Sequence, residues 1–307
     1  MREQFIDWAP KGATSDMVAK ADEICREWGR QGYDLTLRQL YYQFVARDLI
    51  PNTFQSYKRL GGIVDQARLA GLLDWSYIVD RTRNVYSTDG MDTTPEDAIR
   101  ATAGGYRLPR WDDGQPCHVE VWVEKDALSG IVQGAAREVR IPYFACRGYV
   151  SQSEMYASGK RFGRWAHRGK DVHIFHLGDH DPSGIDMSRD IEERLTMFAG
   201  GRKVHVHRIA LNMDQVRQYD PPPNYAKVTD SRFEAYQALY GDDSWELDAL
   251  DPTVLHDLIV TSVREHIDPN AWAAVDARER TDRTLLEGVS RHWDRVVDYV
   301  TDLEERL

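Results

Sequence analysis

The sequence has few cysteines, no long apolar run and no excess of positive charge. Its 307 residues include 3 cysteines, none of them in a Cys-x-x-Cys pair, so neither a disulfide framework nor a cysteine-based zinc site is indicated. Any metal would have to bind to oxygen ligands. No stretch approaches the roughly 18 to 20 apolar residues of a membrane helix, and the first residues contain acids and tryptophan where a signal peptide is apolar. We therefore expect a soluble cytoplasmic protein without a membrane partner.

The net charge of −11, from 39 basic and 50 acidic residues, argues against nucleic-acid binding through a generally basic surface. The acids are unevenly distributed. Residues 1–110 and 111–241 are each close to neutral, whereas residues 242–307 contain 17 acidic and 7 basic residues. A local basic groove is therefore compatible with the first 241 residues. We expect the acidic region to face solvent or a partner.

The N-terminal segment, residues 1–85, shows three helical patterns followed by a short apolar run. The helices are expected at residues 15–30, 36–48 and 54–70, the second opened by a capping box, and a strand is expected at residues 75–79. This is the order of a winged helix-turn-helix domain, in which the third helix faces DNA. Candidate phosphate contacts in this segment are Lys58, Arg59, Arg68, Arg81 and Arg83. Arg147, further along the chain, is another candidate. Solvated surface residues or salt-bridge partners are the alternative for each of them.

The rest of the chain predicts an α/β fold. Residues 86–116 are poor in periodicity and rich in turn residues, so we interpret them as a linker. Across residues 117–241 short apolar runs alternate with helical patterns, which indicates a mostly parallel sheet covered by helices. The expected strands are residues 118–123, 142–146, 172–177 and 204–211. Residues 242–307 are expected to form a helical C-terminal region.

Acidic residues follow two of the predicted strands. Glu124 and Lys125 follow the first, and Asp179-His-Asp181-Pro-Ser-Gly184 follows the third. Because parallel strands end at one edge of a sheet, Glu124, Asp179 and Asp181 should converge there, and convergent carboxylates suit Mg²⁺. Lys125 either supports this site or neutralises it, and His180 is expected near the metal. The alternative is that the Asp-rich segment is only a turn and a helix N-cap.

Two motifs carry a resemblance to a known family. Glu124 after one strand and Asp179-His-Asp181-Pro-Ser-Gly after another look like the Rossmann-like TOPRIM domain of topoisomerases, primases and related nucleases. The Asp-x-Asp-Pro-x-Gly form resembles the A subunit of topoisomerase VI and the related meiotic double-strand-break transesterase. In that family a winged helix with an Arg-x-x-x-Tyr helix precedes the TOPRIM domain, and this chain has Arg38-Gln-Leu-Tyr41-Tyr42 there. The resemblance covers about residues 33–211. The chain also looks shorter than the usual A subunit, like the minimal A-type proteins of phages and prophages.

Helical geometry distinguishes the two neighbouring tyrosines. At roughly 100° per residue, Leu40, Tyr41 and Phe44 share the apolar stripe of the second helix, which predicts that Tyr41 is a core residue. Tyr42 lies on a flank shared with Arg38 one turn earlier. A phenol is a poor nucleophile at neutral pH unless a cation or base assists it, and Arg38 is placed to do so. Packing or stacking on nucleic acid is the alternative role for Tyr42.

The resemblance implies a function in full. Tyr42 would attack double-stranded DNA to form a 5′-phosphotyrosyl link, assisted by Arg38 and Glu124, with Glu124, Asp179 and Asp181 holding Mg²⁺ and Lys125 contacting DNA. The family's arrangement implies a homodimer, in which the tyrosine of one protomer meets the acids of the other. An ATPase partner subunit would be needed for strand passage, since this chain contains no Walker A sequence. The alternatives are a TOPRIM nuclease that uses water and a non-catalytic DNA-binding phage protein.

Overall fold

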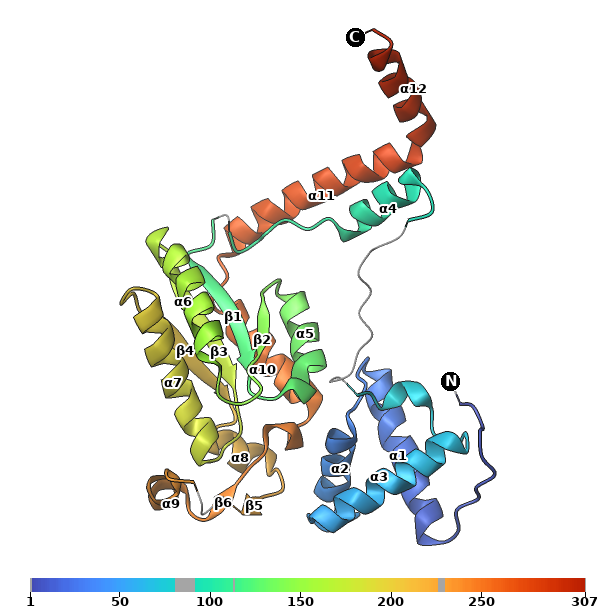
Figure 1. Cartoon of the computed structure of the whole chain (residues 1–307), viewed down its shortest axis with the longest axis vertical. Coiled ribbons are helices and arrows are strands. Elements are labelled where there is room, and N and C mark those ends of the chain that lie inside the picture. The colour runs from blue at the N-terminus through green and yellow to red at the C-terminus, as the bar shows by residue number, and fades with distance from the viewer. Residues whose placement is uncertain (1, 81–91, 113, 226–229, 307) are drawn as a thin grey trace. The chain divides into compact units, whose positions relative to one another are not determined.

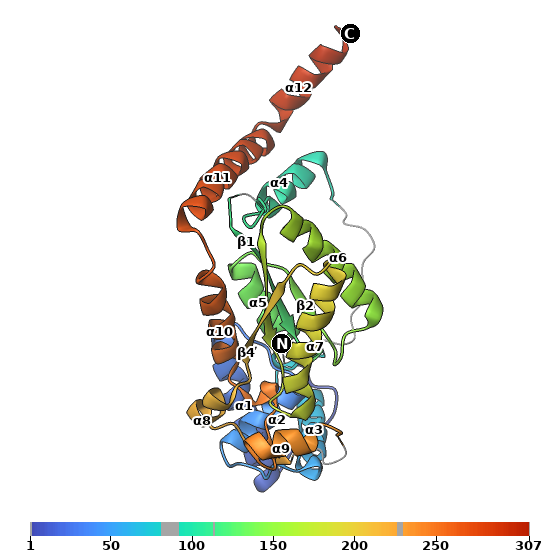
Figure 2. The same ribbon diagram turned by 90° about the vertical axis from the view of Figure 1, so that its left-hand side faces the viewer.

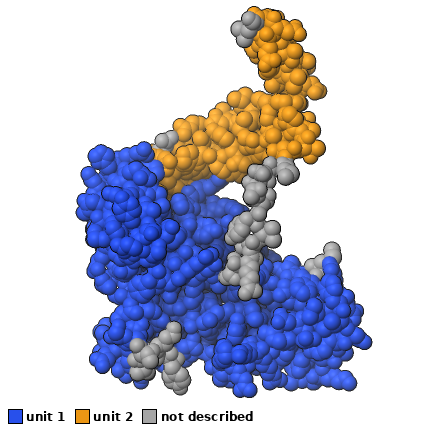
Figure 3. Space-filling view, in the orientation of Figure 1, with its two compact units in different colours: residues 1–83, 119–265 blue, residues 84–118, 266–307 orange. Residues whose placement is uncertain are grey.

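The structure, a computed structural model, describes residues 2–80, 92–112, 114–225 and 230–306 of the chain. It divides into two compact units, which Figure 3 colours separately. The first unit comprises residues 1–83 and 119–265, and the second comprises residues 84–118 and 266–307. None of the helices in the described ranges is both long enough and apolar enough to cross a membrane.

The first unit begins with three helices, α1 (Ala13–Arg30), α2 (Leu37–Ala46) and α3 (Phe54–Leu69), as the sequence predicts (Figure 1). The predicted capping box opens α2. The Thr36 hydroxyl accepts a hydrogen bond from the Gln39 backbone N–H at 3.2 Å, and the Gln39 side-chain oxygen accepts one from the Thr36 N–H at 2.8 Å. The start of α2, and therefore the direction of its side chains, is fixed by these two bonds.

The three helices share one apolar core. Large side chains from all of them are buried in it together with residues of the connecting segments. Its largest members are Ile24, Trp28, Leu35, Leu40, Phe44 and Leu60. Ala249, which lies some 180 residues further along the chain, also belongs to this core. A segment from the C-terminal part of the chain is thus packed against the N-terminal helices.

The strand predicted at residues 75–79 is wrong. The structure has a 3₁₀ helix there, η1 (Trp75–Tyr77), because the Asp74 carboxylate accepts a hydrogen bond from the Ser76 N–H at 2.9 Å and favours a turn over an extended chain. Extended pairing is limited to a single parallel bridge between Leu35 and Ile78. Arg81 and Arg83, which were predicted to contact phosphates, lie outside the described residues.

A four-stranded parallel sheet forms the centre of the α/β fold. Its strands are β1 (Cys117–Val123), β2 (Tyr143–Ala145), β3 (Asp171–Leu177) and β4 (Val204–Ala210), in the order β2-β1-β3-β4. All four strands coincide with predicted ones. Every residue of β1 is buried, including the polar His118 and Glu120, as expected for a strand with both faces covered.

Helices cover both faces of this sheet (Figure 2). On one face α6 (Gln152–His167) and α7 (Pro182–Phe198) pack against each other and against β3 and β4. On the other face α5 (Ser129–Glu138) packs against α10 (Pro252–Arg264), which contacts β3 and β4. Because α10 belongs to this packing, the first unit extends to residue 265. The boundary that was expected at residue 242, before a separate acidic region, is therefore not present there.

Short elements connect the larger ones. The sequence-distant segments β5 (Asn224–Tyr225) and β6 (Asp243–Ser244) form an antiparallel pair, and His180 forms a bridge with Trp245. The remaining elements of the first unit are η2 (Asp126–Leu128), α8 (Met213–Tyr219), α9 (Phe233–Tyr240) and η3 (Leu247–Ala249).

The second unit contains α4 (Pro95–Gly105), α11 (Pro269–Arg291) and α12 (Trp293–Glu304). The interpretation of residues 86–116 as a linker is wrong for α4, which was missed because its only buried residue is Ala103 and it therefore shows little apolar periodicity. Glu279 of α11 accepts a hydrogen bond from the backbone N–H of Leu108 at 2.9 Å. α11 and α12 meet at His292, within the C-terminal region that was expected to be helical.

Truncation of Phe162 tests the packing of α6 on the sheet. Its ring is fully buried among residues of the sheet, α6 and α7. We expect Phe162→Ala to lower the free energy of unfolding by about 3 to 5 kcal/mol, because a large cavity replaces the ring. The matched control is Phe54→Ala, whose ring is 72% exposed and should cost under about 1 kcal/mol. Urea denaturation of both variants measures the difference, and equal losses would contradict this packing.

Candidate functional site

The predicted acids converge at one edge of the sheet. Glu124 follows β1, whereas Asp179 and Asp181 follow β3. All three line one pocket with a volume of about 500 Å³. The neighbouring strand ends are tied together, since the Glu124 carboxylate accepts a hydrogen bond from the Asp179 backbone N–H at 2.9 Å. The predicted convergence of carboxylates at the carboxyl edge is therefore present.

Two glycines allow the acid-bearing loop to pack this closely. A Cβ atom at Gly178 would lie 3.0 Å from Glu124 Oε2 and 3.2 Å from Arg208 Nη1. A Cβ atom at Gly184 would lie 2.2 Å from the Asp179 carbonyl oxygen, a distance that real side chains do not adopt. Glycine is therefore required at position 184, in the first turn of α7, and the close side chains at Gly178 leave little room for a larger residue.

Arg208 of β4 fixes the backbone of the same loop. Its Nη2 donates to the carbonyl oxygens of Gly178 at 3.0 Å, Asp179 at 2.5 Å and Leu211 at 3.2 Å, and its Nη1 donates to that of Gly184 at 2.8 Å. One guanidinium thus orients both the end of β3 and the start of α7. The sequence analysis missed Arg208, although an arginine within a predicted strand of a covered sheet is a signal that could have revealed it.

The carboxylates can offer oxygens to a hard cation. Asp181 is the N-cap of α7, and its Oδ1 accepts from the Gly184 N–H at 2.6 Å and from the Ser183 hydroxyl at 2.9 Å. Among the described residues, Glu124 Oε1, Asp179 Oδ2 and Asp181 Oδ2 have no hydrogen-bond donor. Asp181 thus has both the capping role and a remaining oxygen toward the pocket, and carboxylate oxygens are the ligands that Mg²⁺ prefers. In this structure the ligand oxygens of Glu124, Asp179 and Asp181 do not all lie within 4.8 Å of one another.

A second acidic set lies closer together. Ligand oxygens of Asp179, Glu246 and Asp248 all lie within 4.8 Å of one another, a set that does not include Glu124 or Asp181. The Leu247 N–H between the last two acids donates to Asp179 Oδ1 at 2.7 Å, which fixes η3 beside the end of β3. The sequence analysis missed Glu246 and Asp248 and placed them in a region expected to face solvent or a partner. No local pattern marks them, because only the fold brings them to the pocket.

Lys125 lies among these acids. Its ammonium is 2.8 Å from Asp179 Oδ1 and 2.9 Å from Asp248 Oδ1, and it also pairs with Glu246 Oε2. Burial disfavours the charged lysine, but the three carboxylates outweigh this effect and raise the pKa of Lys125 above its ordinary value. Of the two roles expected for Lys125, neutralisation of the acids is the one that these contacts support.

Arg38 links the acids to α2. Its Nη2 lies 2.9 Å from Glu246 Oε2, its Nε lies 3.0 Å from Asp248 Oδ2, and the same Nη2 lies 3.4 Å from the Tyr42 hydroxyl. The expected neighbourhood of Arg38 and Tyr42, one helical turn apart, is therefore present. A continuous chain of contacts runs from the Tyr42 hydroxyl through Arg38, Glu246 and Lys125 to Asp179.

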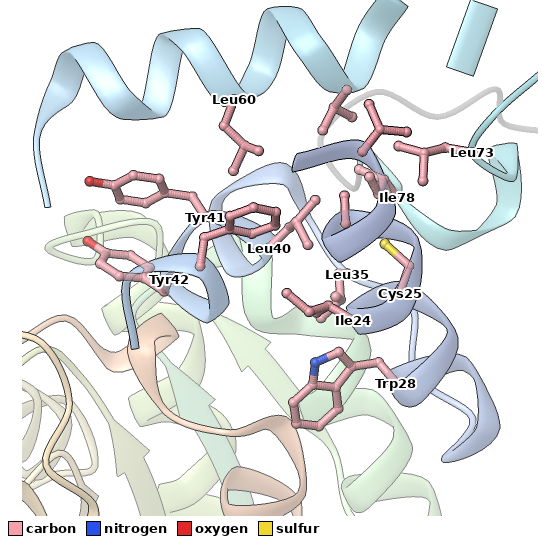
Figure 4. Packing of buried hydrophobic residues seen from close by; sticks show 14 of the residues in the cluster. Ile24, Cys25, Trp28, Leu35, Leu40, Tyr41, Tyr42, Leu60, Leu73 and Ile78 are labelled. Atoms are coloured by element: carbon pink, nitrogen blue, oxygen red, sulfur yellow. The ribbon is translucent and has the colours of Figure 1, made fainter. Parts of the chain in front are cut away.

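Tyr42 is more buried than a flank position suggests. The side chains of Tyr41 and Tyr42 are 5% and 3% exposed, and Figure 4 shows both hydroxyls directed away from Leu40 and the rest of the labelled core. The two hydroxyls face a pocket of about 360 Å³, which shares Arg38, Asn224 and Glu246 with the acidic pocket. Burial, followed by the charges of Glu246 and Asp248, raises the pKa of Tyr42 to about 12. With the acids in this position, the phenol is protonated at neutral pH.

A relay of side chains orients the groups around Tyr42. The Tyr41 hydroxyl donates to Asn52 Oδ1 at 2.8 Å, and Asn52 Nδ2 donates to Asn224 Oδ1 at 2.9 Å. The amide of Asn224 is thereby turned so that its Nδ2 donates to the Tyr42 hydroxyl at 3.3 Å. Tyr42 therefore accepts from two donors, Arg38 and Asn224, an arrangement that favours negative charge on its oxygen. The sequence analysis missed both asparagines.

The other predicted DNA contacts have different surroundings. Lys58 and Arg59 are exposed on α3, and Arg147 is exposed beside the acidic pocket, where it pairs with Asp126 at 3.0 Å. Arg68 is half-buried and donates to the carbonyl oxygens of Trp75 and Ile78 at 3.2 and 3.1 Å, so it holds the turn after α3.

His180 does not face the acids as expected. Its Nδ1 lies 2.8 Å from the Tyr236 hydroxyl, and its ring packs against Tyr240 and Trp245. It lies between two aspartates in the sequence, but successive residues of an extended segment point in opposite directions. His180 therefore anchors the loop instead of lining the pocket.

Removal of the Asp248 charge tests the buried ion pairs. Its side chain is fully buried and contacts both Arg38 and Lys125. We expect Asp248→Asn to lower the free energy of unfolding by about 2 to 3 kcal/mol, because the mostly buried Lys125 loses a charged partner, whereas water can solvate the exposed Arg38. Glu193→Gln is the control, since the exposed Glu193–Arg189 pair should contribute under about 1 kcal/mol. Urea denaturation measures both, and a loss no greater than that of the control would be inconsistent with a buried network.

No protein-family model and no curated protein sequence matches this chain. Its function must therefore be inferred from the chemistry of the site. That site combines carboxylates able to bind a hard cation, two cations paired to acids, and a tyrosine hydroxyl that accepts from two donors.

Proposed function

We propose that the protein is a Mg²⁺-dependent, DNA-cleaving transesterase that resembles the A subunit of topoisomerase VI, with α1–α3 as its winged-helix part and the parallel sheet as its TOPRIM part. The observation that carries the proposal is the chain of contacts from the Tyr42 hydroxyl to Asp179. It brings a candidate nucleophile, two phosphate-binding cations and the candidate metal ligands into two adjoining pockets of one unit.

The proposed reaction exchanges one phosphodiester for another. The Tyr42 oxygen attacks a backbone phosphorus atom, the bond from phosphorus to the 3′ oxygen breaks, and the 3′ oxygen leaves as a hydroxyl after it takes up a proton. The phenol loses its proton in the same process. The products are a 5′-phosphotyrosyl link and a free 3′ hydroxyl, and no water or oxidant is consumed. Because Arg38 and Asn224 donate to the Tyr42 oxygen, they stabilise the negative charge that develops before attack.

Arg38 and Lys125 are the groups that would bind the phosphate. In the absence of DNA each is paired with Glu246 and Asp248. A guanidinium binds phosphate and carboxylate oxygens in the same geometry, so a DNA phosphate can replace a carboxylate on Arg38. Such an exchange replaces the Glu246 carboxylate, one of the charges that raise the pKa of Tyr42, with the negative charge of the phosphate. It places the phosphate on Arg38, one hydrogen bond from the Tyr42 oxygen.

Glu124, Asp179 and Asp181 are the residues that would hold Mg²⁺. When bound, the ion would stabilise negative charge on the phosphate and the 3′ oxygen. The protein contributes the position of the ligands: Arg208 and the two glycines fix the loop, and the Asp179 N–H fixes the Glu124 carboxylate. Burial raises the pKa of Asp179, so this acid gains most from a nearby positive charge.

The proposed site differs from that of the family in one respect. The family arrangement pairs the tyrosine of one protomer with the acids of its partner, whereas here Tyr42 and the acids line adjoining pockets of the same chain. We propose a homodimer in which each protomer supplies a complete site and cuts one strand of double-stranded DNA. ATP-driven strand passage would require an ATPase partner subunit.

A second candidate function is a metal-dependent nuclease that uses water. The buried position of Tyr42 and its raised pKa favour this alternative, since a neutral phenol at neutral pH is a weak nucleophile. The products distinguish the two functions, because hydrolysis leaves a free phosphate on DNA and no protein attached to it.

Substitution of Tyr42 tests the proposal directly. With Mg²⁺ and end-labelled duplex DNA, the wild-type protein should become covalently attached to 5′ ends, and Tyr42→Phe should lower attachment at least 1,000-fold, or on the order of 4 kcal/mol. Tyr41→Phe should retain attachment at a reduced rate because it only loosens the Asn52 relay. Tyr143→Phe, an exposed tyrosine on β2, is the neutral control. Cleavage by Tyr42→Phe at the wild-type rate would refute the tyrosine mechanism in favour of water.

The pH dependence of cleavage provides an independent check. Because the pKa of Tyr42 is raised to about 12, the phenolate fraction is small at pH 8 and increases with pH. We expect the single-turnover rate at saturating Mg²⁺ to rise by up to about tenfold per pH unit between about pH 8 and 10. A rate that is already constant above about pH 8 would contradict attack by a phenolate in this environment.

A further inference from the structure

A hollow on the first unit is lined by positive charge, at the edge of the sheet opposite to the acids. It lies between the C-terminal half of α6 and the turn that follows α7, and its volume is about 560 Å³. The residues that line it include no carboxylate. Its cationic and titratable lining residues, which together define the α6–α7 basic surface, are Lys160, Arg164, His167, Arg168 and Arg202.

The geometry of this surface follows from helical spacing. Lys160, Arg164 and Arg168 recur at i, i+4 and i+8, so they form a row of about 12 Å along one face of α6. Arg202 joins the row from the other side, after a tight turn in which Gly200 and Gly201 both have positive φ angles. All four side chains are exposed.

These cations are not neutralised by the protein. Other exposed arginines of the first unit have acidic partners, such as Arg26 with Asp22 and Arg189 with Asp186. In contrast, Lys160, Arg164, Arg168 and Arg202 form no salt bridge with any described residue. Lys160 and Arg168 lie over the rings of Tyr156 and Trp165 instead. In a chain of net charge −11, a cluster of unpaired cations costs self-repulsion that an anionic ligand would relieve.

We propose that the α6–α7 basic surface binds the backbone phosphates of duplex DNA. Duplex DNA carries about one negative charge per 1.7 Å of its axis, so a row of about 12 Å faces several phosphates at once. The cations are presented on a helix and a turn, and flat aromatic rings support them, which suits backbone contacts without base recognition. The choice of DNA over other polyanions rests on the proposed function.

This surface is separate from the acidic pocket. Arg168 lies three residues before the start of β3, whereas Asp179 follows its end, and seven residues of strand span on the order of 20 Å. The surface therefore contacts DNA at a distance from the cleaved phosphodiester. It adds affinity for DNA that depends neither on Tyr42 nor on a metal. The positive charge that binds DNA is thereby confined to a small area of an acidic protein.

The test is the affinity of the full chain for a fluorescent duplex of about 40 base pairs, measured by anisotropy in EDTA at several salt concentrations. The variant is Arg164→Ala/Arg202→Ala. We expect the slope of log affinity against log salt to fall by about 1.8, and the affinity at about 0.1 M salt to fall roughly tenfold, because two phosphate contacts are lost. Arg26→Ala/Arg189→Ala changes the net charge equally and should retain the wild-type slope.

The outcomes separate this inference from the proposed function. An unchanged slope and affinity for Arg164→Ala/Arg202→Ala would overturn the inference, even if Tyr42 forms a DNA adduct. A loss confined to phosphatidylserine vesicles, with DNA binding intact, would also overturn it and assign the surface to lipid. Reduced DNA binding in a protein that never forms an adduct would support the inference and reject the transesterase. Melting temperatures equal to that of the wild type exclude misfolding as the cause of any loss.

Discussion

The structure of the site depends on one network of ion pairs around the fully buried carboxylate of Asp248. Glu246 and Asp248 contact both Arg38 of α2 and Lys125 after β1, and Glu246 Oε2 is shared by the two cations. A charge removed from water is stable only when it is paired, so Asp248 requires its cations, although Arg38 itself is exposed. The network therefore joins the N-terminal helices to the carboxyl edge of the sheet. Ala249, packed in the helical core, and the Leu247 N–H on Asp179 hold the same segment.

The same network accounts for the chemical state of the site. The acids raise the pKa of Lys125 despite its burial, and burial together with the acids raises the pKa of Tyr42. A polyanion that competes for Arg38 and Lys125 would replace a carboxylate in this network with a phosphate. The excess of acid in the chain does not exclude DNA in this account. Part of it pairs with Arg38 and Lys125, the groups proposed to bind phosphate, and the unpaired cations of the α6–α7 basic surface lie elsewhere.

Much of the fold follows from local signals in the sequence. The Thr36–Gln39 capping box, the apolar stripes of α1–α3 and the four apolar strands all depend on neighbouring residues, and the structure contains each of them. Glu124, Asp179 and Asp181 could be placed because parallel strands end together. Errors arose where a local preference outweighed the pattern, as at Asp74, or where a helix buries little, as in α4. Glu246, Asp248 and Asn224 could not be predicted, because only long-range packing brings them to Tyr42.

The central claim is that Tyr42 itself becomes bonded to DNA. Tryptic cleavage after Arg38 and Arg47 would release residues 39–47, a peptide with both tyrosines, from protein incubated with duplex DNA and Mg²⁺ and then treated with nuclease. Fragmentation of this peptide by tandem mass spectrometry locates the attached nucleotide. The account predicts a 5′ nucleotide on Tyr42 and none on Tyr41. An unmodified peptide, recovered together with cleaved DNA that bears free phosphates, would contradict it.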